Sequence, residues 1–270
     1  MANSINTNQG ALVALQHLNN TSSQLNTTQN RVNTGQKVSS AKDNGAIFAI
    51  ATRQRAEMGA LDSVKQSIQR GQSVVDVALA AGDVVTKALE EQKQLAVAIQ
   101  SATAGSAQET AYLADFNALG AEITKALAGA TFDGVNLFSA GSTTNNLVVQ
   151  TGTGTADTFS VHAEAGTATT VSTATTATRA TATAAIVDTA IQAFTTKLAT
   201  LGTNSKSLER QLTFTSKIQD SLEVGIGNLV DADLAKESAK LTALQTKQQL
   251  GVQALSIANS SSSVLLSLFR

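Results

Sequence analysis

The chain contains no cysteine, no proline and no tryptophan, and it has a single tyrosine in 270 residues. The absence of cysteine excludes disulfides, thiolate metal ligands and cysteine nucleophiles. Average proline usage would place roughly 13 prolines in a chain of this length, so their absence permits helices almost everywhere. With so few aromatic rings, stacking platforms for bases or sugars are nearly excluded. The core must therefore be built from aliphatic side chains and alanine.

The charge is balanced, with 19 basic and 20 acidic residues and a formal net charge of −1. This balance provides no field that would attract nucleic acid or an anionic membrane, so we expect neither partner. The N-terminus lacks the basic and apolar regions of a secretory signal peptide. If the protein leaves the cell, we expect it to do so without a cleaved signal peptide.

Two long heptad patterns predict two long helices. The first runs over residues 61–99 and the second over residues 187–229, each with apolar residues at alternating steps of three and four. At 1.5 Å per residue they would extend about 58 Å and about 65 Å. They are therefore predicted to pair in antiparallel fashion in an elongated molecule. The seam residues for which we predict packing roles are Leu61, Ile68, Val75, Leu89, Leu198, Leu208, Leu212 and Leu222.

Shorter helices are predicted on either side of these patterns. Residues 1–32 form a weak amphipathic pattern that Gly35 is expected to end, and Ser40 with Asp43 fits a capping box for the next helix. A turn at Gly105 and Ser106 is followed by a helical pattern over residues 107–128.

A last helix is predicted from about residue 234 to the C-terminus. Asp231 and Asp233 suit its start, because side chains of this type cap helices and complement the helix dipole.

The middle of the chain, residues 139–184, is dominated by threonine, alanine, serine and glycine. Apolar residues alternate on either side of a glycine-containing turn, which predicts a β-hairpin. These residues are Leu147, Val149, Phe159 and Val161. Residues 166–184 also fit a disordered linker, and their hydroxyls are candidates for glycosylation. The sequence leaves both readings open.

Both ends of the chain are amphipathic and lack charge, with no charged residue before Arg31 and none between Gln248 and Phe269. Exposed helix faces usually carry lysine and glutamate, so we expect these faces to be buried against other helices. Polar residues from Gln248 to Ser263 interrupt the C-terminal segment too often for a membrane span. The residues predicted to make assembly contacts are Leu18, Leu25, Val32, Leu241, Leu244, Leu255, Ala258, Leu265 and Phe269.

Further apolar residues of the C-terminal segment lie off its main heptad line, namely Leu250, Val252, Ile257, Leu266 and Leu268. A single partner helix would not cover them, so several neighbours are expected. A subunit whose self-contacts join different surfaces builds an open helical filament. We therefore predict a subunit that polymerises through its helical ends.

Three segments carry a resemblance to a known family. Residues 31–43, RVNTGQKVSSAKD, resemble the N-terminal signature of bacterial flagellins. Residues 229–237, LVDADLAKE, are similar to the C-terminal half of that signature, and residues 131–138 resemble the motif that follows the family's second helix. Together the resemblance extends over residues 1–138 and 187–270.

The resemblance implies a fold in which the terminal helices form the inner tube of a filament, the long helices form the next shell, and the middle of the chain faces outward. The predicted fold class is thus mainly α, an elongated antiparallel helical coiled-coil bundle with a small β-hairpin region. The expected domains are an inner terminal-helix domain of residues 1–40 and 231–270, a rod domain of residues 41–138 and 185–230, and an outward-facing region of residues 139–184. Residues expected to hold neighbouring subunits in register are Arg31, Asn33, Thr34, Gly35 and Asp43.

By resemblance the chain is a structural subunit that self-assembles into the bacterial flagellar filament for swimming motility. The large outer domains of longer flagellins are missing, as in the short flagellins of several alphaproteobacteria. The resemblance also implies an extracellular location, export through the flagellar type III apparatus, and encounters with an export chaperone, a filament cap and junction proteins.

Other functions were weighed against a filament subunit. A hook-filament junction protein is the alternative within the structural class. A chemoreceptor coiled coil would need a glutamate-rich methylation face and usually a membrane span, and the sequence shows neither. His17 and His162 stand apart from any catalytic or metal-binding pattern. We therefore expect no enzymatic activity, no metal and no cofactor.

Overall fold

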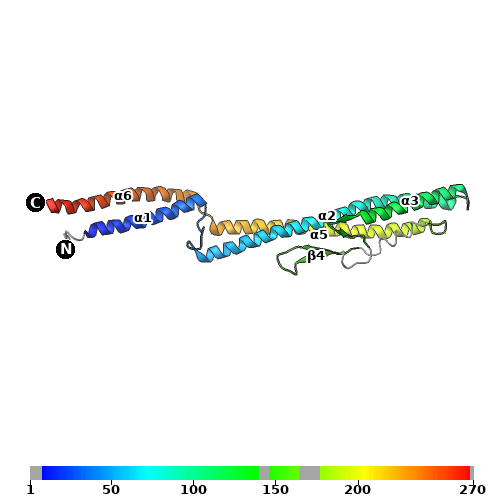
Figure 1. Ribbon diagram of the computed structural model, residues 1–270, viewed down its shortest axis with the longest axis horizontal. Helices are drawn as coiled ribbons and strands as arrows, with labels where there is room; N and C mark the ends of the chain where they lie inside the picture. Colours follow the sequence, from blue (N-terminus) through cyan, green and yellow to red (C-terminus); the bar gives the residue numbers. More distant parts are fainter. Residues whose placement is uncertain (1–7, 140–145, 164–176, 268–270) are drawn as a thin grey trace. The chain divides into compact units, whose positions relative to one another are not determined.

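The computed structural model describes residues 8–139, 146–163 and 177–267, with the backbone alone for residues 261–267. These residues form long helices and two small hairpins (Figure 1). The helices are α1 (Gln9–Thr34), α2 (Gly45–Ser101), α3 (Ala107–Gly129), α5 (Ala184–Val230) and α6 (Leu234–Ser267), and the strands are β1 (Thr131–Phe132), β2 (Val135–Asn136), β3 (Leu147–Gln150) and β4 (Thr158–Val161). The chain divides into two compact units. The first comprises residues 1–56 and 221–270, and the second comprises residues 57–220.

In the second unit, the predicted heptad seam of α2 faces the core. Every position of this seam is buried, from Leu61 to Ile99 at alternating steps of three and four residues. Leu208 of α5 is also buried, and Leu198 and Leu212 are half-buried beside it. Leu222, at the start of the α5 portion that belongs to the first unit, is half-buried too. The seam residues thus lie between the packed helices, as in a coiled coil.

The two long helices run antiparallel in the second unit. Gln219 near the end of the α5 part of this unit donates a hydrogen bond of 2.7 Å to Asp62 of α2. Further along α2, Lys93 forms a 2.6 Å ion pair with Asp188, near the start of α5. The residue numbers of the partners on α5 decrease while those on α2 increase. The predicted antiparallel arrangement is therefore confirmed.

Helix α3 packs on α2 through Phe116, Ile123 and Leu127, which are buried in the same core. Its start is fixed by Ser106, whose hydroxyl accepts a 3.2 Å hydrogen bond from the Glu109 N–H. Gly105 adopts a left-handed φ of 77°, which a residue without Cβ adopts at no steric cost. The predicted turn at this point is confirmed.

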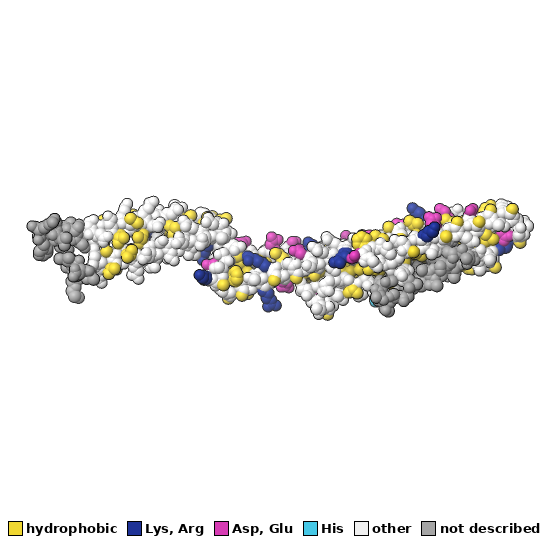
Figure 2. Space-filling model, in the orientation of Figure 1, with side chains coloured by type: hydrophobic (Ala, Val, Ile, Leu, Met, Phe, Trp, Pro, Cys, Tyr) yellow, Lys and Arg dark blue, Asp and Glu magenta, His cyan; other side chains and the backbone are white. Residues whose placement is uncertain are grey.

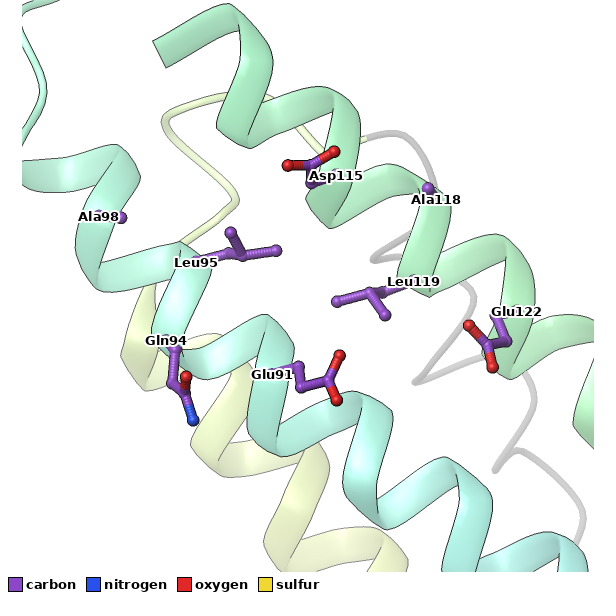
Figure 3. A pocket seen from close by; sticks show the side chains of 8 residues that line it. All are labelled: Glu91, Gln94, Leu95, Ala98, Asp115, Ala118, Leu119 and Glu122. Atoms are coloured by element: carbon purple, nitrogen blue, oxygen red, sulfur yellow. The ribbon is translucent and has the colours of Figure 1, made fainter. Parts of the chain in front are cut away.

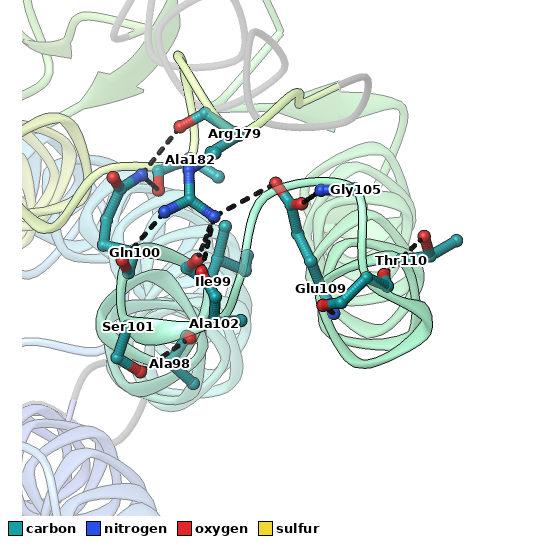
Figure 4. A network of polar contacts seen from close by, with 11 residues as sticks. Ala98, Ile99, Gln100, Ser101, Ala102, Gly105, Glu109, Thr110, Arg179 and Ala182 are labelled. Carbon is teal, nitrogen blue, oxygen red and sulfur yellow. Dashed lines mark hydrogen bonds and ion pairs between the residues drawn. The ribbon is translucent and has the colours of Figure 1, made fainter.

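The end of α2 is capped by the side chain of Arg179, which lies shortly before α5 in the sequence. Arg179 donates hydrogen bonds of 3.0, 2.9 and 3.0 Å to the carbonyls of Ile99, Ala102 and Gln100, which lack partners within the helix (Figure 4). The same guanidinium lies 3.4 Å from a carboxylate oxygen of buried Glu109. One arginine therefore joins the end of α2, the start of α3 and the segment before α5.

Two hairpins follow α3. Strands β1 and β2 are joined by Asp133 and Gly134, both at positive φ, as a two-residue hairpin turn requires. Just after β2, the ring of Phe138 packs against Phe194 of α5 at a centroid distance of 5.6 Å.

Strands β3 and β4 form the hairpin that the sequence predicts at these residues. They pair in antiparallel register, with Leu147 opposite Val161 and Val149 opposite Phe159. A hydrogen bond of 3.1 Å from the Gln150 N–H to the Ser67 hydroxyl links β3 to α2. The prediction of a hairpin at these residues is confirmed. The alternative reading of residues 166–184 as a disordered linker falls largely on residues outside the described part, while residues 177–184 lead into α5.

In the first unit, α1 packs against α6. Helix α1 ends at Gly35, which has a left-handed φ of 69° as predicted for a helix stop. The two connections that follow α1 and α5 then pair with each other, because the Lys37 N–H donates to the Val230 carbonyl and the Ala232 N–H donates to the Gly35 carbonyl. Asp233 caps α6 by accepting a 3.1 Å hydrogen bond from the Lys236 N–H, as predicted.

The predicted capping box at Ser40 is wrong. Helix α2 begins later than that box and well before the regular heptad pattern, at Gly45. Its cap is Asn44, whose side chain accepts a 3.1 Å hydrogen bond from the Ile47 N–H. Asp43 instead accepts hydrogen bonds from the N–H and hydroxyl groups of Ser39 and Ser40, and so it orders the turn before α2.

Candidate assembly surface

The paired terminal helices bury one set of predicted assembly residues between them. Leu25 of α1 and Leu244 of α6 are buried, and Thr28 lies beside Leu25 on the same face of α1 with 1% of its surface exposed. The remaining described members of that set are half-buried, namely Leu18, Val32, Leu241, Leu255 and Ala258. The side chain of Leu265 and the whole of Phe269 lie outside the described residues. The predicted assembly residues of α1 and α6 thus form the contact between these two helices.

A second set of apolar side chains faces outward from this pair. On α1 these are Leu12, Val13 and Leu15, and on α6 they are Leu250, Val252 and Ile257. Their exposed fractions lie between 43% and 71%. On the face shown in Figure 2, hydrophobic side chains gather at the end of this unit without a charged side chain among them.

The outward residues of α6 agree with the sequence-based expectation that one partner helix would not cover this segment. Those of α1 were missed, because Leu12, Val13 and Leu15 lie between the heptad positions that identified the helix. Their signal is the local apolar run at residues 11–15 in a stretch without charge. An uncharged helical surface with large exposed apolar side chains is typical of an interaction site.

The residues of the linker signature lie around the junction of α1, α2 and α6. Arg31 forms a 3.2 Å ion pair with Glu237 and so connects the end of α1 to the start of α6. Thr34 donates a 2.7 Å hydrogen bond to the Asn30 carbonyl, and Asn33 is exposed beside it. Arg31 and Gly35 therefore act within the chain, whereas Asn33 and Thr34 present exposed surface.

Asp43 holds the turn between α1 and α2. One of its carboxylate oxygens accepts hydrogen bonds of 3.0 and 3.1 Å from the N–H groups of Ser40 and Ser39, and of 3.1 and 3.2 Å from their hydroxyls. These donors, with the Ser40 N–H first, lower the pKa of the Asp43 carboxyl, because they stabilise its ionised form. The carboxylate is fully exposed to solvent, so it orders the turn without being buried.

We also searched the described residues for metal sites and membrane-spanning helices. No group of three or more histidine, cysteine, aspartate or glutamate side chains in the described residues is placed to hold a metal ion. None of the described helices is long and apolar enough to cross a membrane. His17 and His162 are both exposed, on α1 and just after β4.

Comparison with known families gives the same picture of two helical ends. The family model of the bacterial flagellin N-terminal helical region matches residues 5–144, and that of the bacterial flagellin C-terminal helical region matches residues 184–269. The chain belongs to the bacterial flagellin family. The resemblance found in the sequence is confirmed, and the β3–β4 hairpin of this flagellin lies between the two matched regions.

Individual relatives agree over the full length of this flagellin. Flagellin FljO of Caulobacter vibrioides is 54% identical over 273 residues, which cover 99% of both chains. A flagellin of Brucella melitensis is 38% identical and also covers 99% of both chains. Among solved structures, the crystal structure of Bacillus cereus flagellin has 21% sequence identity and a TM-score of 0.48, covering 55% of this chain and 88% of that one.

Proposed function

We propose that this flagellin is the structural subunit of a bacterial flagellar filament, which it builds by assembling with copies of itself into a helical polymer for swimming motility. The observation that carries the proposal is the uncharged apolar surface of the α1–α6 pair, formed by Leu12, Val13, Leu15, Leu250, Val252 and Ile257. A lone chain leaves this surface in water. Neighbouring copies would cover it.

Burial of this surface contributes substantially to assembly. Complete burial of a large aliphatic side chain contributes about 1.5–3 kcal/mol, and roughly half of each of the six side chains remains to be buried, which gives about 5–9 kcal/mol per subunit. The loss of translational and rotational freedom costs about 4–15 kcal/mol, so other contacts between subunits add to this gain in a stable polymer. The exposed apolar side chains lie on both α1 and α6, and this distribution suits contacts with several neighbours in a helical polymer.

The other parts of the chain have roles that follow from this arrangement. We assign residues 1–40 and 231–270 to the inner part of the filament, residues 41–138 and 185–230 to the surrounding rods, and residues 139–184 to the outer face. Asn33 and Thr34, which are exposed at the linker, are the residues of the signature that we propose to contact neighbouring subunits. The buried seams then act as stiff rods that transmit torque.

The proposal includes an extracellular location and a structural rather than enzymatic role. It also includes export through the flagellar apparatus, with a chaperone that covers the apolar C-terminal helix before export and a cap under which the filament grows. The part of α6 after Lys247 carries no charged residue and exposes apolar side chains, which supports the need for such a chaperone, because exposed apolar helices associate unselectively. Neither the two family matches nor the described part of the chain favours a hook-filament junction protein.

The test is seeded polymerisation of the purified chain, followed by electron microscopy and sedimentation. Leu250→Gln combined with Ile257→Gln should raise the critical concentration at least about tenfold, which corresponds to a loss of about 1.4 kcal/mol of association free energy. Val148→Gln is the control, since Val148 is exposed to the same extent as Leu250 but lies on β3. Deletion of residues 251–270 should leave a helical monomer that does not polymerise. Normal filaments from the truncated chain would contradict the proposal.

A further inference from the structure

The turn before α2 holds two adjacent residues that can react with each other. Asn44 is followed by Gly45, and this is the single Asn-Gly pair in the sequence. In such a pair the backbone nitrogen of glycine can attack the side-chain amide of asparagine, because the glycine has no Cβ that shields the nitrogen. The attack closes a five-membered ring within one chain, so the attacking atom has a high effective concentration.

The structure leaves the attacking nitrogen available. Asn44 and Gly45 are both exposed. Gly45 is the first residue of α2, where N–H groups have no acceptor within the helix, and its N–H forms no hydrogen bond in the described part of the chain. Apart from its chain neighbours and the backbone of the helix, no atom lies within 4 Å of the place that a Cβ of Gly45 would take. Water therefore reaches the peptide bond between the two residues.

The side chain of Asn44 is held in a position that activates its amide. Its oxygen accepts a 3.1 Å hydrogen bond from the Ile47 N–H. This donor would stabilise the negative charge that develops on the oxygen when Cγ is attacked, as the donors of an oxyanion hole do. The positive end of the helix dipole acts in the same direction and also favours loss of the Gly45 amide proton. The cap of α2 therefore promotes the attack.

We propose that Asn44 is a site of spontaneous deamidation, at which each copy of the chain acquires one carboxylate with age. The Gly45 nitrogen loses its proton to water or hydroxide and bonds to Cγ of Asn44, and the side-chain nitrogen leaves as ammonia. Water then opens the resulting succinimide ring. Cleavage of the bond to Cγ gives aspartate, whereas cleavage of the bond to the backbone carbonyl carbon gives isoaspartate. The net reaction consumes one water and releases one ammonia, so it needs no enzyme.

The two products differ in their effect on the start of α2. Aspartate keeps an oxygen at the place of the cap and adds negative charge at the positive end of the helix, where such charge is favourable. Isoaspartate lengthens the backbone by one carbon atom and so displaces the oxygen from the Ile47 N–H. Either product adds a second carboxylate beside Asp43, and deamidation thus distinguishes old copies of the chain from new ones. The inference goes beyond the proposed function and does not depend on it.

Mass spectrometry of the full chain tests the inference. The purified, folded chain is kept for weeks at neutral pH and physiological temperature, and a sample digested at once gives the background. Trypsin releases residues 43–53 as one peptide, in which Asn44 is the single asparagine. Deamidation raises the mass of this peptide by one unit, and labelling with a protein isoaspartyl methyltransferase reveals the isoaspartate form.

Two other asparagines of the same chain provide an internal comparison. Asn33 is exposed like Asn44, and Asn204 is half-buried. Each is followed by a residue that has a Cβ and lies within a helix, so its nitrogen is shielded and engaged in the helix. Asn44 should be converted at least about tenfold faster than either of them.

Gly45→Ala is the matched variant. A Cβ at this position meets no atom within 4 Å, and alanine suits a helix, so the variant should fold as wild type does. Its conversion should be at least about tenfold slower than that of wild type. Asn44→Ser keeps a capping oxygen without a side-chain amide, so its peptide 43–53 should gain no mass.

The same chain unfolded in urea shows whether the fold permits the reaction. If Asn44 stays intact in the folded chain while it is converted in urea, the fold shields the amide and the inference is overturned. Equal rates for wild type and Gly45→Ala would overturn it as well. Both results would leave the proposed function intact, because seeded polymerisation is measured separately.

Discussion

Gly71 of α2 lies directly against Val149 of β3, so close that a Cβ on Gly71 would overlap a methyl carbon of Val149. Val149 is almost fully buried, and its branched side chain has few alternative rotamers in a strand. The missing side chain of Gly71 therefore allows the β3–β4 hairpin to lie on the long helix.

Gly71→Ala should destabilise the second unit by about 1–2 kcal/mol, because the cost of overpacking exceeds the gain of about 1 kcal/mol in helix propensity. Gly59→Ala is the control in the same helix, since no atom lies within 4 Å of its Cβ position. It should stabilise the chain by about 0.5–1 kcal/mol. Urea unfolding measures both changes, and equal gains from the two substitutions would contradict the contact.

Removal of Arg179 should loosen the end of α2. Arg179→Met deprives three carbonyls at and just after the end of α2 of their donor and buried Glu109 of its cationic partner, so we expect a loss of about 1–3 kcal/mol in the free energy of unfolding. Arg179→Lys should recover only part of it, because an ammonium lacks the fork of a guanidinium. Arg70→Met is the matched control. Its 3.8 Å pair with Asp133 is 60% exposed on both sides and should contribute less than about 0.5 kcal/mol.

Gln92 is buried at 0% exposure in the seam between α2 and α3, and only half of its amide is satisfied. Its nitrogen donates a 3.0 Å hydrogen bond to the Phe116 carbonyl, while its oxygen is buried without a partner in the described part of the chain. Gln92→Leu should therefore stabilise the second unit by about 0.5–1.5 kcal/mol. Thermal unfolding measures the change, and a lower midpoint would show that the amide is worth more than a leucine here.

The turn at Asp43 should respond to acid. Because its pKa is lowered by folding, the ionised carboxylate stabilises the turn above the ordinary carboxyl pKa of about 3.9, and this contribution disappears as the pH falls through the lowered value. Ser40→Ala removes the hydroxyl donor and should raise the pKa of Asp43 toward its ordinary value. An NMR titration of the Asp43 carboxyl measures the shift. Ser63→Ala, on the exposed face of α2, should leave that pKa unchanged.

The long helices could be predicted because their signal repeats. The seam over residues 61–99 repeats at steps of three and four through eleven intervals without a break, and each position reports the same buried face. Cysteine, proline and most aromatic residues are absent as well, which leaves helices with aliphatic seams as the main way to build a core. Repetition and composition therefore agreed on the fold class.

Single-residue choices were harder to predict. Ser40 and Asn44 are both good caps in the same linker, and only the path of the chain shows that Asn44 begins α2 while Asp43 serves the turn. The outward residues of α1 escaped notice for a related reason. Helices α1 and α6 each carry two apolar faces. A search for heptads finds the face by which the two helices contact each other and overlooks the face that points outward.

The pocket between α2 and α3, which is lined by Glu91 and Glu122 among others, was also beyond the sequence (Figure 3). These two residues are separated by the last ten residues of α2, a turn and about two thirds of α3, so their convergence depends on how α3 packs against α2. Packing of this kind follows from side-chain shapes along both helices, whereas a pattern search treats each helix by itself.

Phe138 and Arg179 have a consequence for how such a protein can vary. The first fixes the point where the chain leaves the bundle, through Phe194, and the second fixes the point where it returns, through the end of α2. Closing a longer excursion between two fixed points costs only about 0.6 kcal/mol for each doubling of its length. Between these two points the β3–β4 hairpin is itself packed on α2, so we expect peptides inserted on either side of that hairpin to leave the bundle of α2, α3 and α5 folded.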